Sequence, residues 1–286
     1  MAGARRFWIA PACSLVLATG AVLGAGEYLS APARHPVGVP PADLFATPVV
    51  IPSAKGDVAG WVARGSGRGA VLLLHGVRSD RRQMQGRALF LNRLGYTVLL
   101  VDLASHGESA GKRITFGAHE AHSVRAALAY LRRGLPGEKI GVIGVSLGAA
   151  SLVLSKPGQA IDALVVESMY PTIEDAVENR LAARLGPPGR WLAPLLLQQI
   201  PLRTDVPVAA LRPVDAMASI ACPVFVIGGA LDVQTPAVET HRVFAAAQAP
   251  KQLWIVDGAA HVDLHGYAGS EYERRVGAFL VRYLGR

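Results

Sequence analysis

Cysteine is scarce in this chain, with only two among 286 residues. Cys13 lies in an apolar N-terminal stretch, and Cys222 directly precedes an apolar segment that is predicted to be a core strand. Two cysteines in such different settings do not pair, so we expect no disulfide bond. The cysteine content therefore does not constrain the compartment of the protein.

Acidic residues are outnumbered: 29 Lys and Arg against 21 Asp and Glu leave a formal net charge of +8. The basic residues are scattered, in short pairs such as Arg81-Arg82 and Arg274-Arg275, and no nucleic-acid-binding motif accompanies them. We therefore expect no nucleic-acid partner. A cationic surface that faces anionic lipid headgroups and an ordinary solvated surface both fit this charge.

The zinc-binding pattern H-E-x-x-H is absent from the sequence. His119 and His122 stand three residues apart on a predicted helix, a spacing that can bind a metal, but no third ligand is close in sequence. A solvated helix face is the preferred interpretation of this pair. We predict neither a metal site nor a cofactor.

Charge is missing from the whole stretch between Arg6 and Glu27. About 20 apolar residues can span a bilayer, whereas the apolar core of a secretory signal has ~7–15. Residues 1–29 are therefore predicted to be a transmembrane anchor or signal segment; the length favours an anchor, and small residues near Gly26 leave cleavage open. Because arginines that precede an apolar span stay in the cytoplasm, the rest of the chain is expected to be extracytoplasmic, either anchored or exported after cleavage.

The remaining chain is predicted to hold a proline-rich linker and one domain. Residues 30–52 contain six prolines and are interpreted as an extended linker. In residues 53–286, apolar strand-length segments alternate with helical patterns, which predicts an α/β domain with a mostly parallel sheet covered on both faces. The predicted strands are residues 58–64, 70–74, 97–101, 139–145, 163–166, 224–228 and 253–256, and the predicted helices are residues 81–94, 117–133, 147–156, 236–248 and 271–283.

The alternation is interrupted at about residues 168–218, between two predicted strands. This insertion is rich in apolar residues and is interpreted as a short helical lid. Its apolar side chains are expected to line a pocket for an acyl chain, to contact a membrane, or only to seal the core of the domain.

The most informative motif is Gly144-Val145-Ser146-Leu147-Gly148, which stands between a predicted strand and a predicted helix. In that setting G-x-S-x-G forms a sharp turn that exposes the serine hydroxyl, and the glycines are needed because the turn crowds positions two residues before and two after the serine. The motif nominates Ser146 as a nucleophile.

A serine nucleophile needs a base, and the base needs an acid to orient it. Asp232 and His261 follow the next two predicted strands in the order nucleophile, acid, base, and the ends of such strands meet at one edge of a parallel sheet. Glu167, at the end of another predicted strand, is the main alternative acid. Asp257 and Asp263 stand too close to His261 in sequence to orient it easily.

Together these motifs resemble the α/β-hydrolase superfamily, and within it the serine hydrolases related to Bem46, the ABHD12/13/17-type proteins and the serine aminopeptidase-like peptidases. The resemblance runs from about Val58 to the C-terminus. Besides the serine motif, it rests on Leu72-Leu73-Leu74-His75-Gly76, on the segment Asp102 to Ser109, on Leu231-Asp232 with Thr235-Pro236, and on His261.

The resemblance implies an α/β-hydrolase fold and a catalytic triad of Ser146, His261 and Asp232. It places the oxyanion hole at the backbone N–H groups of Val77 and Leu147, and it makes His75 a structural residue. The chain departs from the family pattern at Ala104 and Ser105, where arginine and glycine are usual. We expect these changes to affect the local loop and to remove an ion pair, but not the triad.

The implied function is cleavage of a carboxylic ester, thioester or amide through an acyl-enzyme, without a cofactor. A serine at the turn, where epoxide hydrolases and haloalkane dehalogenases carry aspartate, argues against those two reactions. A peptidase or acyltransferase on the same fold and a non-enzymatic, membrane-anchored binding or scaffold protein are the alternatives. The expected partners are a small-molecule or lipid acyl substrate and a membrane contacted through the N-terminal segment.

Overall fold

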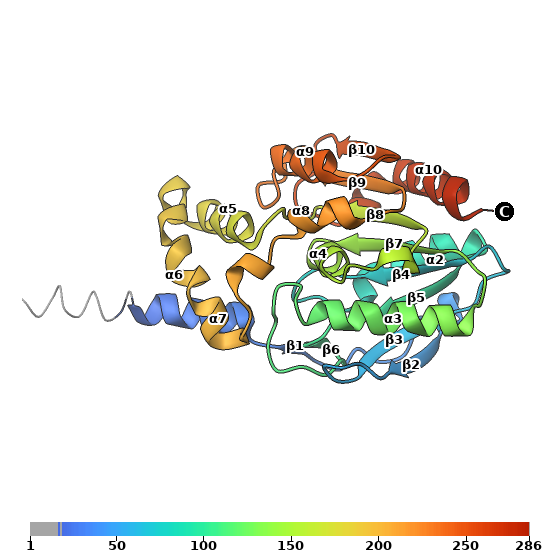
Figure 1. Ribbon diagram of the computed structural model, residues 1–286, viewed down its shortest axis with the longest axis horizontal. Coiled ribbons are helices and arrows are strands. Elements are labelled where there is room, and N and C mark those ends of the chain that lie inside the picture. The colour runs from blue at the N-terminus through green and yellow to red at the C-terminus, as the bar shows by residue number, and fades with distance from the viewer. Residues whose placement is uncertain (1–16, 18, 286) are drawn as a thin grey trace, which may run out of the picture.

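The computed structural model describes residue 17 and residues 19–285. An eight-stranded sheet runs through the molecule in the order β10-β9-β8-β7-β4-β5-β3-β2 (Figure 1). Strand β3 pairs antiparallel with β2 and with β5, and all other neighbours in this sheet are parallel, so the predicted mostly parallel sheet is confirmed. The strands are β2 (Thr47–Ile51), β3 (Val58–Ala63), β4 (Ala70–Leu74), β5 (Thr97–Val101), β7 (Ile140–Val145), β8 (Ala163–Glu167), β9 (Val224–Gly229) and β10 (Lys251–Val256).

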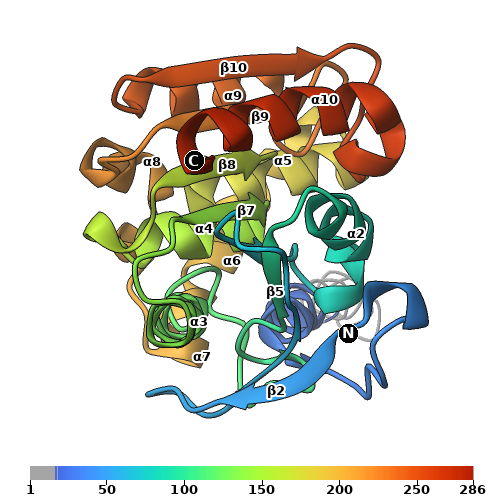
Figure 2. The ribbon, with the colours of Figure 1, turned by 90° about the vertical axis from the view of Figure 1, so that its right-hand side faces the viewer.

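Helices cover both faces of the sheet, and Figure 2 shows α2 and α3 on opposite sides of it. Successive side chains of a strand point to opposite faces. In β4, Leu72 and Leu74 therefore join the core under α3, α4 and α9, while Val71 and Leu73 join the core under α2 and α10. This double burial explains why the strands are continuous apolar runs. The helices are α2 (Gln85–Arg93), α3 (Glu120–Gly134), α4 (Leu147–Leu154), α9 (Ala237–Ala246) and α10 (Leu264–Leu284).

Two segments differ from the sequence-based expectation. Part of the predicted linker is strand β2, in which Pro48 is tolerated because β2 is an edge strand that pairs only with β3. A second part, β1 (Ala33–Arg34), pairs with β6 (His106–Gly107) in a separate small sheet. Residues 30–52 are thus partly built into the sheets instead of forming an extended linker.

Between β8 and β9 the chain forms a group of short helices, which we call the insertion. They are α5 (Ile173–Leu185), a 3-10 helix (Pro187–Leu192), α6 (Ala193–Leu197), α7 (Gln199–Thr204) and α8 (Pro213–Ala216). In Figure 1, α5, α6 and α7 lie at the same end of the molecule as the helix formed by residues 19–30, which we call the N-terminal helix.

Hydrogen bonds and close packing join the N-terminal helix to the insertion. The Gln199 amide donates to the carbonyl oxygen of Val22 at 3.2 Å, and Arg203 donates to that of Leu23 at 2.9 Å. Gly26 is buried where the helices approach, and a Cβ atom there would lie 2.7 Å from Cδ of Gln199. In residue 17 and residues 19–285, no helix is both long and apolar enough to cross a membrane. The rest of the predicted anchor, residues 1–16 and 18, lies outside the described residues.

Candidate active site

Ser146 lies in the tight turn between β7 and α4, as the sequence motif predicts. Its backbone has φ 49° and ψ −108°, a conformation that residues other than glycine rarely adopt. A Cβ atom on Gly144 would lie 2.6 Å from the nitrogen of Ala149, and one on Gly148 would lie 2.5 Å from the carbonyl oxygen of Leu74. The glycines are therefore required by the close approach of the helix to the strands.

Ser146 lies in the wall of a cavity, and its hydroxyl is not used in any structural hydrogen bond of the described residues. Its Oγ atom is buried and has no hydrogen-bond partner within the described part of the chain. Ser146 lines a cavity of about 550 Å³, and His261 lines the same cavity. A buried hydroxyl that makes no structural hydrogen bond and faces a cavity is available to a substrate.

His261 and Asp232 are joined by a hydrogen bond of 2.7 Å between Nδ1 and Oδ2. Asp232 lies just after β9, and His261 lies in the loop after β10, so each follows the carboxyl end of a strand, as does Ser146. Thr235 donates its hydroxyl to Oδ2 of Asp232 at 2.7 Å and its backbone N–H to Oδ1 at 2.9 Å. Burial alone would raise the pKa of Asp232, but the hydrogen bonds from His261 and Thr235 outweigh it and hold this pKa below its ordinary value. Asp232 thus stays a carboxylate that orients the imidazole.

Glu167, the alternative acid, is bound elsewhere. Arg87 donates to both of its carboxylate oxygens, at 3.0 and 2.6 Å, and the Tyr272 hydroxyl donates to Oε1 at 2.5 Å. Arg87 also pairs with Asp263 at 2.6 Å. The nearby carboxylates are thus held by Arg87, and the acid that contacts His261 is Asp232.

Val77 and Leu147, the residues predicted to form an oxyanion hole, both line the cavity that holds Ser146. Leu147 is the first residue of α4, where backbone N–H groups have no partner inside the helix. Within residues 19–285, neither N–H group donates to a protein acceptor. Both donors are therefore open to an oxygen atom bound in the cavity.

His75 is a structural residue of the loop beside the site. Its Nδ1–H donates to the carbonyl oxygen of Gly76 at 2.7 Å, and Nε2 accepts from the backbone N–H of Leu103 at 3.0 Å. Burial is the main cause that lowers the pKa of His75 to about 3, so the imidazole is neutral at physiological pH. It ties the loop after β4 to the loop after β5.

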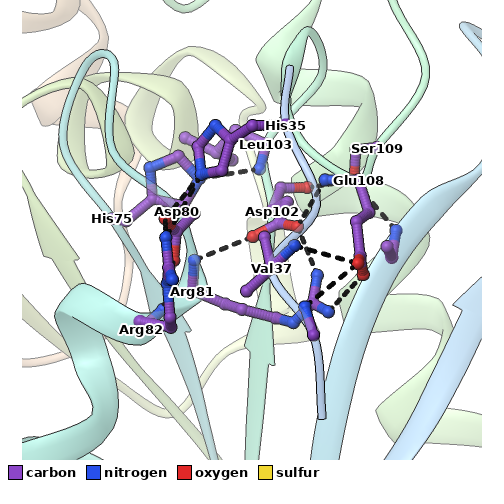
Figure 3. Close-up of polar contacts among 12 residues, drawn as sticks. His35, Val37, His75, Asp80, Arg81, Arg82, Asp102, Leu103, Glu108 and Ser109 are labelled. Atoms are coloured by element: carbon purple, nitrogen blue, oxygen red, sulfur yellow. Dashed lines mark hydrogen bonds and ion pairs between the residues drawn. The ribbon is translucent and has the colours of Figure 1, made fainter. Parts of the chain in front are cut away.

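The segment that departs from the family pattern keeps both its turn and an ion pair. Ser105 adopts φ 66°, the left-handed conformation that the usual glycine would take. Asp102 pairs with Arg81, which also pairs with Glu108; Figure 3 shows Arg81 reaching between these two carboxylates. Asp102 thus has an ion-pair partner although position 104 carries alanine, and that partner comes from the 3-10 helix Arg81–Met84.

The cavity is enclosed by three parts of the chain: the site loops, the insertion and the N-terminal helix. From the N-terminal helix, Tyr28 and Leu29 contribute to its wall. The sequence predicted this helix only as an anchor or signal, and no pattern in the sequence indicates that it lines a pocket. The wall from the insertion is largely apolar and includes Ile173, Val177, Leu181, Leu185, Leu196 and Ile200.

His119 and His122, which stand at a spacing that can bind a metal, lie at the start of α3. His119 and His122 are both partly exposed, and Glu120 between them is buried, where its carboxylate accepts from the Thr115 hydroxyl at 2.6 Å. In the stretch that the structure describes, no three His, Cys, Asp or Glu side chains gather in a way that would hold a metal ion.

Comparisons with known proteins agree on one family and fold. A model of the Alpha/beta hydrolase family matches residues 71–274. The uncharacterized protein YqkD of Bacillus subtilis is 27% identical over 245 residues, which cover 82% of this chain and 79% of that protein. An uncharacterized protein of Mycobacterium tuberculosis is 31% identical over 222 residues, which cover 75% of this chain and 72% of that protein.

Among solved structures, the esterase Pf2001 of Pyrococcus furiosus is 27% identical and has a TM-score of 0.75, covering 90% of this chain and 99% of that one. An esterase of Thermogutta terrifontis, 18% identical with a TM-score of 0.63, shares the fold. The finer resemblance to the Bem46 and ABHD-type proteins stays a prediction.

Proposed function

Because the chain belongs to the Alpha/beta hydrolase family, we propose that it is a serine hydrolase that cleaves carboxylic esters. The observation that carries this proposal is the 2.7 Å bond between His261 and Asp232 in a site where Ser146 and His261 line one cavity. The esterases among the structural neighbours support an ester as the substrate over a thioester or an amide.

The proposed reaction begins with attack of Ser146 Oγ on the carbonyl carbon of the ester. Nε2 of His261 takes the hydroxyl proton, and the Asp232 carboxylate stabilises the imidazolium that forms. The N–H groups of Val77 and Leu147 bind the oxyanion, at about 3 kcal/mol per donor in sites of this kind. His261 returns the proton to the leaving alcohol, and water then attacks the acyl-enzyme with His261 again as base, which releases the acid and restores Ser146.

Two alternatives use the same site. An acyltransferase would replace water by an alcohol or amine at the second step, and a peptidase would release an amine at the first. A non-enzymatic scaffold would need none of the hydrogen bonds that hold Asp232 against His261.

A fluorophosphonate probe tests the proposal, because it reacts covalently with an activated serine. We expect an adduct on Ser146, found by mass spectrometry of the digested protein, and hydrolysis of p-nitrophenyl esters that is lost in Ser146→Ala. Ser168→Ala is the matched control, since Ser168 lines the same cavity and its hydroxyl also lacks a protein partner in the described region. A folded protein that the probe leaves unlabelled sinks the proposal.

We also propose that the enzyme works at a membrane surface on the extracytoplasmic side. Large apolar side chains of the insertion are exposed, notably Trp191 at 79% and Leu202 at 83%. Helices α6 and α7 of the insertion share an end of the molecule with the N-terminal helix, whose first part belongs to the apolar stretch that begins at Phe7. Cell fractionation and protease accessibility in intact cells test this placement, and recovery of the intact chain in the soluble cytoplasmic fraction would contradict it.

A further inference from the structure

Arg180 is a cation in the cavity wall that makes no ion pair within the described residues. It projects from α5, and one of its guanidinium nitrogens donates to the carbonyl oxygen of Ala176 in the same helix at 3.1 Å. Within residues 19–285, no carboxylate forms an ion pair with it. The other guanidinium N–H groups are thus available to a ligand in the cavity.

The carboxylates near Arg180 have other partners. Asp232 is held by His261 and Thr235. Glu239 accepts from the Asn179 amide at 2.5 Å. Asp263, which lines the cavity, pairs with Arg87. A shift of one of these side chains toward Arg180 would break a hydrogen bond that is buried or part-buried, so none of them is a ready partner.

The other arginines of the cavity divide into two kinds. Arg203 pairs with Glu27, and Arg78 donates to the carbonyl oxygen of Tyr28 at 2.8 Å, so both hold the N-terminal helix in place. Arg184 stands one turn after Arg180 on α5, lines the cavity rim, and likewise makes no ion pair in the described part of the chain. Like charges at this spacing repel each other, and a bound anion would relieve the repulsion.

Burial favours an anion at this place. Burial is the main influence on the pKa of Arg180 and lowers it, although a guanidinium keeps its charge at physiological pH. A partly desolvated and unpaired cation is costly, and its planar fork suits a carboxylate or phosphate. The surrounding wall is apolar, which suits a hydrocarbon chain.

We propose that Arg180, with Arg184 at the rim, forms an anion-binding subsite, and that the preferred substrates are esters that carry an apolar chain and one carboxylate or phosphate group. This inference rests on the proposed ester hydrolysis and adds the substrate class to it. The anion would be bound while the ester carbonyl lies at Ser146.

Matched pairs of esters test this preference. In the first pair, mono-p-nitrophenyl glutarate is compared with p-nitrophenyl butyrate, so that the carboxylate is on the acyl side. In the other pairs, p-butyryloxybenzoate or p-butyryloxyphenyl phosphate is compared with phenyl butyrate, so that the carboxylate or phosphate is on the leaving group. We expect the ratio of kcat/KM for charged over neutral ester to exceed one in at least one pair. Arg180→Gln should lower that ratio about tenfold or more, as loss of a charge-assisted hydrogen bond does.

Arg133→Gln, an exposed arginine on α3 that does not line the cavity, makes the same charge change and should leave the ratio unaltered. Arg180→Lys should restore part of the preference because it restores the charge without the planar fork. If no pair favours the charged ester, or if Arg180→Gln leaves every ratio unaltered, the subsite is refuted while ester hydrolysis stands.

Binding to Ser146→Ala separates failure of the subsite from failure of the proposed function, since it needs no turnover. Calorimetry should show decyl phosphate or decanoate binding about tenfold or more tightly than decanol, and Arg180→Gln in the same background should remove the difference. Equal binding of all three ligands overturns the inference. Tight anion binding by a protein that hydrolyses no ester would keep the subsite and refute the hydrolase.

Discussion

At the scale of single residues, the site depends on the hydrogen bonds that hold Asp232. Its two oxygens accept from the Thr235 hydroxyl, from two backbone N–H groups and from His261. Thr235 was part of the sequence resemblance, but the direction of its hydroxyl could not be inferred from spacing. In the proposed mechanism Thr235 is a positioning residue, which acts on His261 through Asp232.

Thr235→Val is expected to lower kcat about tenfold, because it removes one hydrogen bond to a charged group without a large change in volume. The measurement is kcat for a p-nitrophenyl ester. Thr240→Val is the matched control, since the buried Thr240 hydroxyl has no partner within the described residues. Equal losses in the two variants would contradict a positioning role for Thr235.

Glu239 makes stability depend on pH. Burial raises its pKa to about 7, although the hydrogen bond from Asn179 opposes this rise. Between pH 4.5, the ordinary pKa of this side chain, and about pH 7, the folded protein holds a proton that the unfolded chain has released. The stability due to this proton is fully present at lower pH and is lost as the pH rises through 7.

Glu239→Gln should therefore be more stable than the native chain at about pH 8, by roughly 1–3 kcal/mol, and about equally stable near pH 4. The amide keeps the shape of the protonated acid. Urea unfolding at the two pH values measures the difference. A gain of the same size at both would show that ionisation of Glu239 is not its cause.

At the scale of elements, the turn at Ser146 could be predicted because its requirements are local. A strand, two glycines at fixed spacing and a helix are adjacent in sequence, and the close packing that they permit follows from chain geometry. The ion pair of Asp102 could not be predicted in this way. Arg81 begins the 3-10 helix Arg81–Met84 after β4, whereas Asp102 follows β5, and only the parallel pairing of β4 with β5 brings the two segments together.

Gly148→Ala should abolish activity and destabilise the fold by about 2–4 kcal/mol, because its Cβ atom would meet the carbonyl oxygens of Leu74 and His75 at 2.5 and 2.7 Å. Gly134→Ala is the matched control, since a Cβ atom there meets nothing within 4 Å at the end of α3. It should be neutral or stabilising by up to about 1 kcal/mol. Thermal unfolding and ester hydrolysis measure both effects, and a stable, active Gly148→Ala would contradict the crowded turn.

At the scale of the whole molecule, the cavity belongs to no single element. The loops after the strands carry Ser146 and His261, the proposed reacting groups. The insertion and the N-terminal helix line the rest of the cavity. The N-terminal helix is held by Arg78 and Arg203, whose partners stand far away in sequence. The position of this helix therefore determines how much apolar wall a long acyl chain can contact.

Gly26→Leu should displace the N-terminal helix, because a side chain there meets Gln199. We expect the ratio of kcat/KM for a decanoate ester to kcat/KM for a butyrate ester to fall about tenfold. This is the effect of losing the burial of one or two methylene groups of the longer chain, at ~0.8 kcal/mol each. Gly24→Leu is the matched control in the same helix, where a Cβ atom meets nothing within 4 Å. Equal ratios in the two variants would mean that the helix does not shape the cavity.

The sequence by itself determined the parts of this protein that depend on short-range order: the buried strands, the order of Ser146, Asp232 and His261, and the glycines around the turn. These features follow from the periodicity of apolar residues, from the spacing of the glycines around Ser146 and from the positions where the predicted strands end, all of which depend on local chain geometry. Only the tertiary structure decided that Arg87 holds Glu167, that Arg81 pairs with Asp102, and that the N-terminal helix lines the cavity. Such pairings join residues far apart in the chain, and their energies depend on burial and direction, which spacing in a sequence does not encode.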